Sequence, residues 1–199
     1  MSDTVSLAGR VDAIVMGASA GGIEALMALL PALPARLAMP VFIVLHLPRD
    51  RPSKLADIFA PKCRLPVHEA QDKEPVRPGT VYFAPPDYHL LIDDGPALAL
   101  SSDELVNFSR PSIDVLFESA AEVYRSRLLG IILTGANEDG AAGLAAVGEA
   151  GGITIVQQPH TAQVKSMVLS ALSRAPASHV LELEDIAVVL ATLNEGRTP

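Results

Sequence analysis

Nearly continuous apolar runs, each closed by a turn or a loop, recur along the chain. Such runs are typical of strands that are buried on both faces of a parallel sheet. Helical patterns of apolar positions separate most of the runs, so strands and helices are expected to alternate. The runs lie at residues 11–16, 41–45, 81–84, 128–134 and 153–156.

The segments between these runs predict helices and one exception to the alternation. Residues 89–92 and 97–100 flank a turn containing Asp-Gly, which predicts a β-hairpin. We therefore expect an α/β fold: a doubly wound, mostly parallel, Rossmann-like three-layer sheet with an antiparallel hairpin added to it. Residues 1–10 are expected to form a polar lead-in and residues 11–199 a single domain. Helices are expected at 23–30, 52–60, 111–123, 141–150, 164–173 and 185–194, with short strands at 67–70 and 180–181.

Composition narrows the class of protein. The chain has 199 residues, 49% of them hydrophobic and 4% aromatic, which suffices for a well-buried aliphatic core. Its formal net charge of −8, without a basic cluster, argues against a nucleic-acid partner. Cys63 is the single cysteine, which excludes a disulfide framework and a cysteine-rich metal site. No apolar run is long enough to span a bilayer, so we expect a cytoplasmic protein without membrane insertion.

The first predicted strand ends in Gly17-Ala18-Ser19-Ala20-Gly21, a G-x-S-x-G pattern between a strand and a helix. Such a turn can present a nucleophilic serine, here Ser19, beyond the carboxyl end of the strand. The N–H groups of Ala20, Gly21 and Gly22 would open the helix and could stabilise an oxyanion. Glycine-rich turns at this place also bind phosphate. The stretch alone therefore leaves a nucleophile and a phosphate loop open.

Two further side chains follow predicted parallel strands. His46 directly follows the run 41–45, and Asp139 follows the run 128–134. The carboxyl ends of parallel strands meet at one edge of a sheet. A serine hydroxyl needs an imidazole to accept its proton and a carboxylate to orient that imidazole. Ser19, His46 and Asp139 are therefore a candidate catalytic triad for acyl transfer. Their order, and the placement of Ser19 after the first strand rather than a central one, argue against an ordinary α/β-hydrolase esterase.

Nucleotide and metal binding find little support in the sequence. A dinucleotide motif G-x-G-x-x-G would need glycine in place of Ser19, and the second predicted strand ends in His46 rather than an acidic residue. The Gly-Lys-Ser/Thr of a Walker-type loop does not occur. The remaining histidines share no metal-ligand spacing and are expected to be structural or on the surface: His68, His89, His160 and His179.

Several separate stretches match the motifs of one family. Residues 17–22 are similar to GASTGG, which carries a nucleophile, and His46 lies in a stretch similar to V-Q-H-x-P. Residues 133–140 resemble LTGMGxDG, whose aspartate corresponds to Asp139. Residues 78–85 and 110–117 match two further segments. By these motifs, nearly all of residues 11–192 resemble the catalytic domain of the CheB-type chemotaxis receptor methylesterases.

The resemblance implies a serine hydrolase in which Ser19 attacks, His46 accepts the proton and Asp139 holds the imidazole. The implied substrates are glutamyl methyl esters on the cytoplasmic helices of chemoreceptors, which are hydrolysed with release of methanol. Family members also deamidate particular receptor glutamines, and no metal or organic cofactor is implied. The receiver domain usual in the family is not in this sequence. Either this is an excised or stand-alone catalytic domain, or control comes from another chain, for which a separate receiver or regulator protein is the candidate partner.

Several positions differ from the family motifs, among them Val168, which stands where the family has proline after Met167. Ala20 replaces a threonine, Ala136-Asn137 replaces Met-Gly, and Ser109 replaces a histidine. Ala136 is assigned to the loop beside the oxyanion site, and Asn137 is a candidate substrate-binding residue. Arg110 could contact an acidic receptor helix or equally form a salt bridge within its loop. Ala136 and Asn137 keep open a serine esterase or amidase of the same fold with another substrate. A non-catalytic binding module also stays open.

Overall fold

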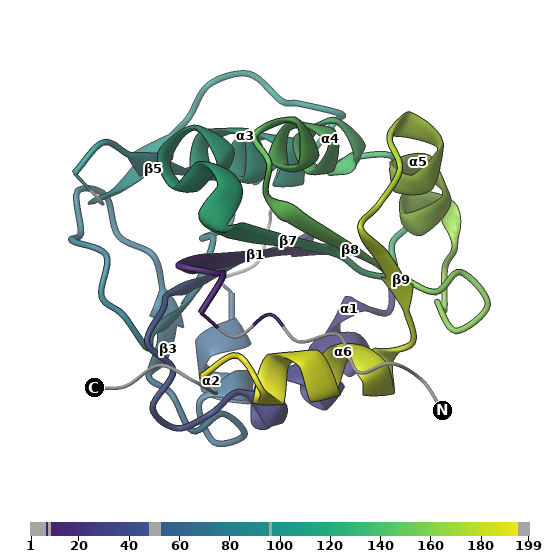
Figure 1. Ribbon diagram of the computed structural model, residues 1–199. Helices are drawn as coiled ribbons and strands as arrows, with labels where there is room; N and C mark the ends of the chain where they lie inside the picture. The colour runs from purple at the N-terminus through teal and green to yellow at the C-terminus, as the bar shows by residue number, and fades with distance from the viewer. Residues whose placement is uncertain (1–6, 8, 48–52, 96, 195–199) are drawn as a thin grey trace.

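A seven-stranded parallel sheet forms the middle layer of the molecule (Figure 1). The computed structural model describes residues 7, 9–47, 53–95 and 97–194. Across the sheet the strands follow the order β3-β4-β2-β1-β7-β8-β9, and all neighbouring pairs run parallel. Their bounds are β1 Ala13–Ala18, β2 Val41–Leu45, β3 Val67–Glu69, β4 Val81–Phe83, β7 Leu128–Ile132, β8 Ile153–Gln157 and β9 His179–Leu181.

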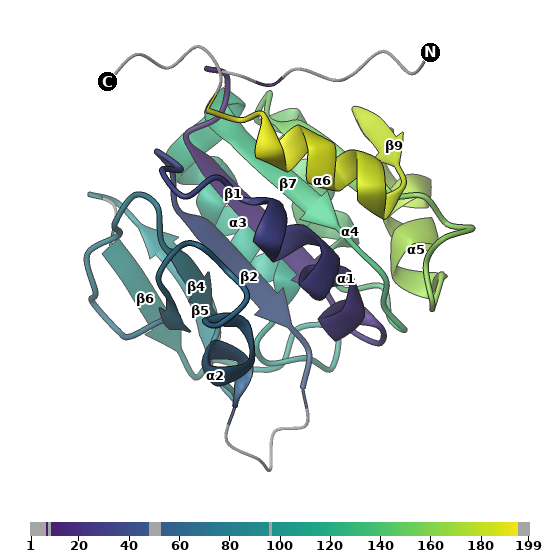
Figure 2. The same ribbon diagram turned by 90° about the horizontal axis from the view of Figure 1, so that it is seen from below.

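Helices cover both faces of the sheet, which confirms the predicted doubly wound α/β fold (Figure 1). One face carries α1 Gly22–Leu29, α2 Leu55–Phe59 and α6 Leu183–Ala191. The other face carries α3 Ile113–Tyr124, α4 Ala141–Glu149 and α5 Ser166–Arg174. Figure 2 shows α1 and α6 lying next to each other over the middle of the sheet. Single 3₁₀ turns extend α1 at Leu30–Ala32 and α3 at Arg125–Arg127.

The predicted hairpin consists of β5 His89–Asp93 and β6 Ala97–Ser101, which pair antiparallel. It forms a two-stranded sheet of its own instead of extending the parallel sheet. The hairpin packs against α3, where Leu90, Ile92 and Leu98 are buried in the core of that face. Burial against a helix gives the hairpin the apolar partner that an isolated pair of strands lacks in water.

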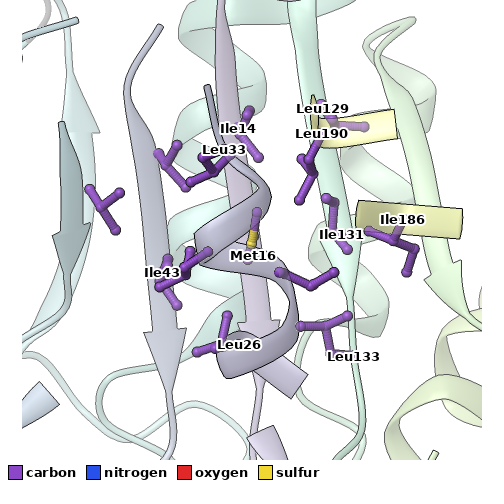
Figure 3. Close-up of a cluster of buried hydrophobic side chains, with 14 of the residues drawn as sticks. Ile14, Met16, Leu26, Leu33, Ile43, Leu129, Ile131, Leu133, Ile186 and Leu190 are labelled. Atoms are coloured by element: carbon purple, nitrogen blue, oxygen red, sulfur yellow. The ribbon is translucent and has the colours of Figure 1, made fainter. Parts of the chain in front are cut away.

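Strand β1 is buried on both faces, because helices cover both sides of the sheet. Ile14 and Met16 point into the cluster beneath α1 and α6 (Figure 3). Ala13 and Val15 point into the opposite cluster beneath α3. Full burial of a Val, Ile or Met side chain contributes about 1.5–3 kcal/mol. This alternation explains why the strand reads as an apolar run rather than as alternating apolar and polar residues.

The position of β1 corrects one sequence-based argument. Ser19 follows the first strand of the chain, but that strand is central, because β1 lies between β2 and β7. The chain moves outward from β1 through β2 in one direction and through β7 in the other. Ligands of open α/β sheets bind at such a switch point. Gly17 allows α3 to cross here, since a Cβ on Gly17 would lie 2.4 Å from the Ile113 side chain.

The boundaries of some elements differ from the predictions. Helix α2 is shorter than the predicted 52–60, and Pro52, its expected start, lies outside the described residues, as does Pro48 of the histidine motif. Of the predicted lead-in, residues 1–6 and 8 also lie outside them, whereas Leu7 is buried in the core beneath α6. Among the described residues, no helix has the length and apolar character needed to cross a membrane.

Candidate active site

The turn after β1 presents Ser19 at the carboxyl edge of the sheet. The Ser19 N–H donates to the Thr134 carbonyl at 3.0 Å, which joins this turn to the one after β7. The Gly22 N–H donates back to the Ser19 carbonyl at 2.8 Å and closes the turn into α1. Gly21 has a φ of +79°, a left-handed conformation that favours glycine. A Cβ there would also lie 2.5 Å from the Gln163 Oε1, so the turn needs glycine for two reasons.

His46 stands at the end of the neighbouring strand β2, where its N–H donates to the Ala18 carbonyl at 3.1 Å. Its Nε2 lies 2.8 Å from Oδ2 of Asp139, and the His46 side chain is 13% exposed. This orientation gives the ring an N–H at Nε2 that donates to the carboxylate, which leaves Nδ1 as the nitrogen that can accept a proton.

Asp139 is fully buried and accepts hydrogen bonds from the first turn of α3. The Ile113 N–H lies 2.6 Å from Oδ2, and the Ser112 hydroxyl lies 2.7 Å from Oδ1. Burial by itself favours the neutral acid, but the hydrogen bonds from His46, Ile113 and Ser112 outweigh burial and lower the pKa of Asp139. The amino end of a helix also favours a negative charge. The carboxylate therefore stays charged beside His46.

A second buried carboxylate lies behind the first. Asp114 Oδ1 accepts the N–H groups of Gly140 and Gly143 at 2.9 and 2.6 Å, which ties α3 to the start of α4. The Asn107 amide bridges the two carboxylates, at 2.8 Å from Asp114 Oδ2 and 3.2 Å from Asp139 Oδ1. Burial, together with the nearby charge of Asp139, raises the pKa of Asp114. No sequence pattern indicates a role for Asn107, which lies in an irregular polar loop.

Ser19 and His46 line the same pocket, which has a volume of about 240 Å³. The structure therefore brings the three predicted side chains together: the pocket joins Ser19 to His46, and a hydrogen bond joins His46 to Asp139. The Ser19 hydroxyl and His46 form no hydrogen bond, a contact that in many enzymes tightens only when substrate binds. The other residues of the lining are Leu47, Phe108, Ser109, Arg110, Pro111 and Asn137.

The backbone N–H groups proposed for an oxyanion fall into two kinds. Within the described residues, the N–H groups of Ala20 and Gly21 donate to no other group, so they are available to a ligand. Gly22 is a wrong assignment, because its N–H already donates to the Ser19 carbonyl and its neighbourhood is buried. Ala136 is exposed and is absent from the pocket lining, so nothing in the described structure places it at the reacting carbonyl.

Arg110 and Asn137 both line the pocket, but their side chains are engaged with other groups of the protein. The Arg110 guanidinium donates to Asp87 at 2.8 and 3.1 Å and to the carbonyls of Ser102 and Asp103 at 2.7 and 2.9 Å. Of the two roles left open by the sequence, the loop salt bridge is therefore the one that the structure displays. Asn137 Nδ2 donates to the Ser109 hydroxyl at 3.2 Å, so it connects the loops on the two sides of the pocket.

Two side chains that support the site through hydrogen bonds were not predicted from the sequence. Thr134 Oγ1 donates to the Ala20 carbonyl at 2.9 Å and accepts the Val164 N–H at 2.9 Å, so it anchors the turn of the nucleophile. His89 is buried, and its Nδ1 accepts the Ser112 N–H at 3.1 Å. The available signal for Thr134 was a polar residue at the end of an apolar run, whereas nothing near His89 indicated its partner.

A metal site has no support in the described part of the chain. No group of three or more His, Cys, Asp or Glu side chains lies there in an arrangement that could hold a metal ion. His46 and Asp139 are engaged with each other, and His160 pairs with Glu182 on the surface. The chemistry that this site can perform with its own groups is proton transfer and nucleophilic attack.

Comparisons with known proteins agree on one family. Residues 14–190 match the family model described as CheB methylesterase. A Leptospira interrogans protein with the provisional name protein-glutamate methylesterase/protein-glutamine glutaminase is 46% identical over 185 residues, which are 93% of this chain and 96% of that protein. A Caulobacter vibrioides protein-glutamate methylesterase/protein-glutamine glutaminase is 37% identical over 93% of this chain, which spans about half (54%) of that relative. The crystal structure of the Thermotoga maritima CheB methylesterase catalytic domain superposes with a TM-score of 0.86 at 34% identity, covering 91% of this chain and 97% of that domain.

Proposed function

Because the chain belongs to the CheB methylesterase family, we propose that it hydrolyses glutamyl methyl esters of chemoreceptors and deamidates receptor glutamines. Family membership supports the reaction class. The observation that carries the proposal is the meeting of Ser19 with the His46–Asp139 pair at the carboxyl ends of neighbouring strands. Methylated receptor helices lie in the cytoplasm, so the cytoplasm is the proposed location. A separate receiver or regulator protein is the proposed source of control.

The first half of the proposed reaction forms an acyl-enzyme. Ser19 Oγ attacks the ester carbonyl carbon and gives its proton to His46, whose available nitrogen is Nδ1 because Nε2 is bonded to Asp139. The carbonyl oxygen becomes an oxyanion, which the N–H groups of Ala20 and Gly21 are free to stabilise. The bond to the methoxy group then breaks, and His46 gives its proton to the departing oxygen. Methanol leaves, and the glutamyl group remains on Ser19.

The second half releases the product. A water molecule attacks the acyl carbon, His46 takes one of its protons, and the bond to Ser19 Oγ breaks as that oxygen regains a proton. The product is a glutamate side chain. Asp139 holds the ring orientation and offsets the charge of the imidazolium in both halves, which its lowered pKa allows. With a glutamine substrate the same steps release ammonia.

Methanol release from methylated receptor membranes tests this proposal. We expect Ser19→Ala to reduce the rate by several orders of magnitude, because the attacking oxygen is lost. Ser173→Ala, an exposed serine on α5, serves as the matched control and should act like wild type. Equal rates in wild type and Ser19→Ala would contradict any serine hydrolase mechanism. Hydrolysis of a small ester without receptor demethylation would instead select a hydrolase with another substrate.

A further inference from the structure

A tight turn at residues 106–109 holds an aromatic ring in solvent at the rim of the pocket. Val106 and Ser109 pair antiparallel, with N–H to carbonyl distances of 3.2 and 2.8 Å. The two residues between them, Asn107 and Phe108, have φ values of +48° and +59°. A bulky side chain rarely adopts this left-handed conformation. Phe108 is nevertheless held in it with 93% of its surface exposed.

Hydrogen bonds to the carboxylates of Asp139 and Asp114 anchor the turn. The Asn107 amide donates to the carboxylates of Asp114 and Asp139, and the Ser109 hydroxyl donates to the Asn107 carbonyl at 3.2 Å. The inward residue of the turn is thus fixed to the triad carboxylate while the outward residue, Phe108, faces solvent. An exposed ring contributes little to core burial. Its place in the pocket lining with Ser19 and His46 puts Phe108 where a bound substrate would meet it.

Phe108 lines the catalytic pocket and also a second hollow. This groove has a volume of about 710 Å³ and also contains Leu105, which is 43% exposed. Phe108 and Arg110 line both the groove and the catalytic pocket, so the two hollows are adjacent. The groove is completed by Glu104 and Asn107. The lining that the two hollows share thus includes an exposed aromatic residue.

The proposed function indicates which part of the substrate would lie against Phe108. A pocket of about 240 Å³ accepts one side chain of a helical substrate, so the neighbouring side chains of that helix must lie outside it. On a helix, the residues three and four positions from the ester share its face, about 5–6 Å away. We propose that Phe108 and Leu105 bind an apolar side chain of the substrate helix that lies one turn from the reacting glutamyl ester. The inference rests on the proposed function and assigns to Phe108 the selection of substrate sequence.

Steady-state kinetics of Phe108→Ala test the proposal. We expect the KM for methylated receptor to rise about tenfold with kcat within about twofold of wild type, because the lost contact lies outside the reacting groups. Hydrolysis of p-nitrophenyl acetate, which lacks a helix, should fall much less than hydrolysis of methylated receptor, because Phe108 lines the pocket but is not one of the reacting groups. Phe108→Tyr, which keeps an aromatic ring, should have the KM of wild type, and Leu105→Ala should raise the KM. Val188→Ala, at an apolar residue on α6 whose exposure of 48% is close to the 43% of Leu105, should leave all values unchanged.

Methyl-esterified helical peptides make the test specific to the contact. Replacing the apolar residue one turn from the ester by serine should lower kcat/KM about tenfold for wild type and leave Phe108→Ala unaffected. If the serine replacement in the peptide lowers kcat/KM by the same factor for Phe108→Ala as for wild type, the two side chains act independently, and the inference is overturned. An unchanged receptor KM would also overturn it, as would an equal loss on p-nitrophenyl acetate, which would mean that Phe108 acts through the triad. If wild type releases no methanol from receptors, both proposals fail; if it does and Phe108→Ala behaves like wild type, only this one fails.

Discussion

Replacement of Asp139 by asparagine probes the charge and the acceptor capacity of the buried carboxylate together. Every polar neighbour of this side chain is a donor. Oδ2 accepts from His46 and from the Ile113 N–H. Oδ1 accepts from the Ser112 hydroxyl, the Asn107 amide and the Asp114 N–H. Asparagine keeps the shape of the side chain but turns one acceptor into a donor. Whichever way its amide is oriented, the new NH₂ group faces at least one fixed donor.

The expected loss of stability follows from these contacts. With NH₂ in the place of Oδ2, the Ile113 N–H loses its acceptor. With NH₂ in the place of Oδ1, the Asp114 N–H loses its acceptor, and the Asn107 amide keeps only its bond to Asp114. Each buried donor left unsatisfied costs about 1–3 kcal/mol, and the bonds that remain lose their charge. We expect the free energy of unfolding to fall by roughly 2–4 kcal/mol. For a chain of this size, that corresponds to a Tm about 5–15 °C lower.

The expected loss of activity has a separate origin. An amide nitrogen toward His46 makes Nε2 an acceptor and moves the ring proton to Nδ1, the nitrogen assigned to Ser19. Histidine then cannot accept the serine proton. The equivalent change in Ser-His-Asp proteases lowers kcat about 10⁴-fold. We expect Asp139→Asn to lower kcat for methanol release by about 10³–10⁴-fold.

Urea unfolding and methanol release measure the two losses on the same preparation. Glu138→Gln, a neighbouring exposed carboxylate, is the matched control and should stay within about 0.5 kcal/mol of wild-type stability. A kcat of more than a tenth of wild type in folded Asp139→Asn would refute the assignment of Asp139 to the triad. A stability within the range of the control would refute the account of its hydrogen bonds.

Three further predictions concern the frame around the triad. Gly21→Ala should lower the free energy of unfolding, measured in urea, by about 1–3 kcal/mol more than Gly95→Ala does. Both glycines have positive φ, but only at Gly21 would a Cβ meet another side chain. Equal losses in the two variants would contradict the steric argument. Thr134→Val should cost about 1–3 kcal/mol and reduce activity, with Thr134→Ser near wild type, because the buried hydroxyl holds the turn of Ser19; an inactive but fully stable Thr134→Ser would contradict this. The pKa of Asp139 is lowered from 3.8, so its charged form stabilises the fold: the stability difference between wild type and Asp139→Asn should be constant above about pH 5 and shrink as the pH falls below about 4. A difference that grows toward acid pH would have the wrong sign.

The sequence predicted the sheet well because its strands are buried on both faces. The runs at 41–45 and 153–156 match the bounds of β2 and β8 to within one residue. A short apolar run of that kind is typical of a strand buried on both faces. The hairpin at 89–101 was found from its Asp-Gly turn, but its separation from the main sheet was not. Which surface a hairpin packs against depends on tertiary contacts with α3, and local sequence does not encode them.

The candidate site was predicted only in part, for a physical reason. Ser19, His46 and Asp139 each directly follow a strand or its turn, so the shared sheet edge brings them together. Asn107 and His89 act through side chains that reach elements far away in the sequence, and no spacing reveals such contacts. The hydrogen bond that occupies the Gly22 N–H depends on the closure of the turn, which the glycine pattern alone does not specify.

The central claim is that His46 and Asp139 activate Ser19 as a nucleophile. Treatment of the wild-type chain with a fluorophosphonate, followed by mass spectrometry of its peptides, tests this without a receptor. We predict a phosphonate adduct on Ser19 that forms at least about 100-fold more slowly in Asp139→Asn and in His46→Ala. An adduct on another serine, or labelling of Ser19 at the same rate in all three proteins, would contradict the account.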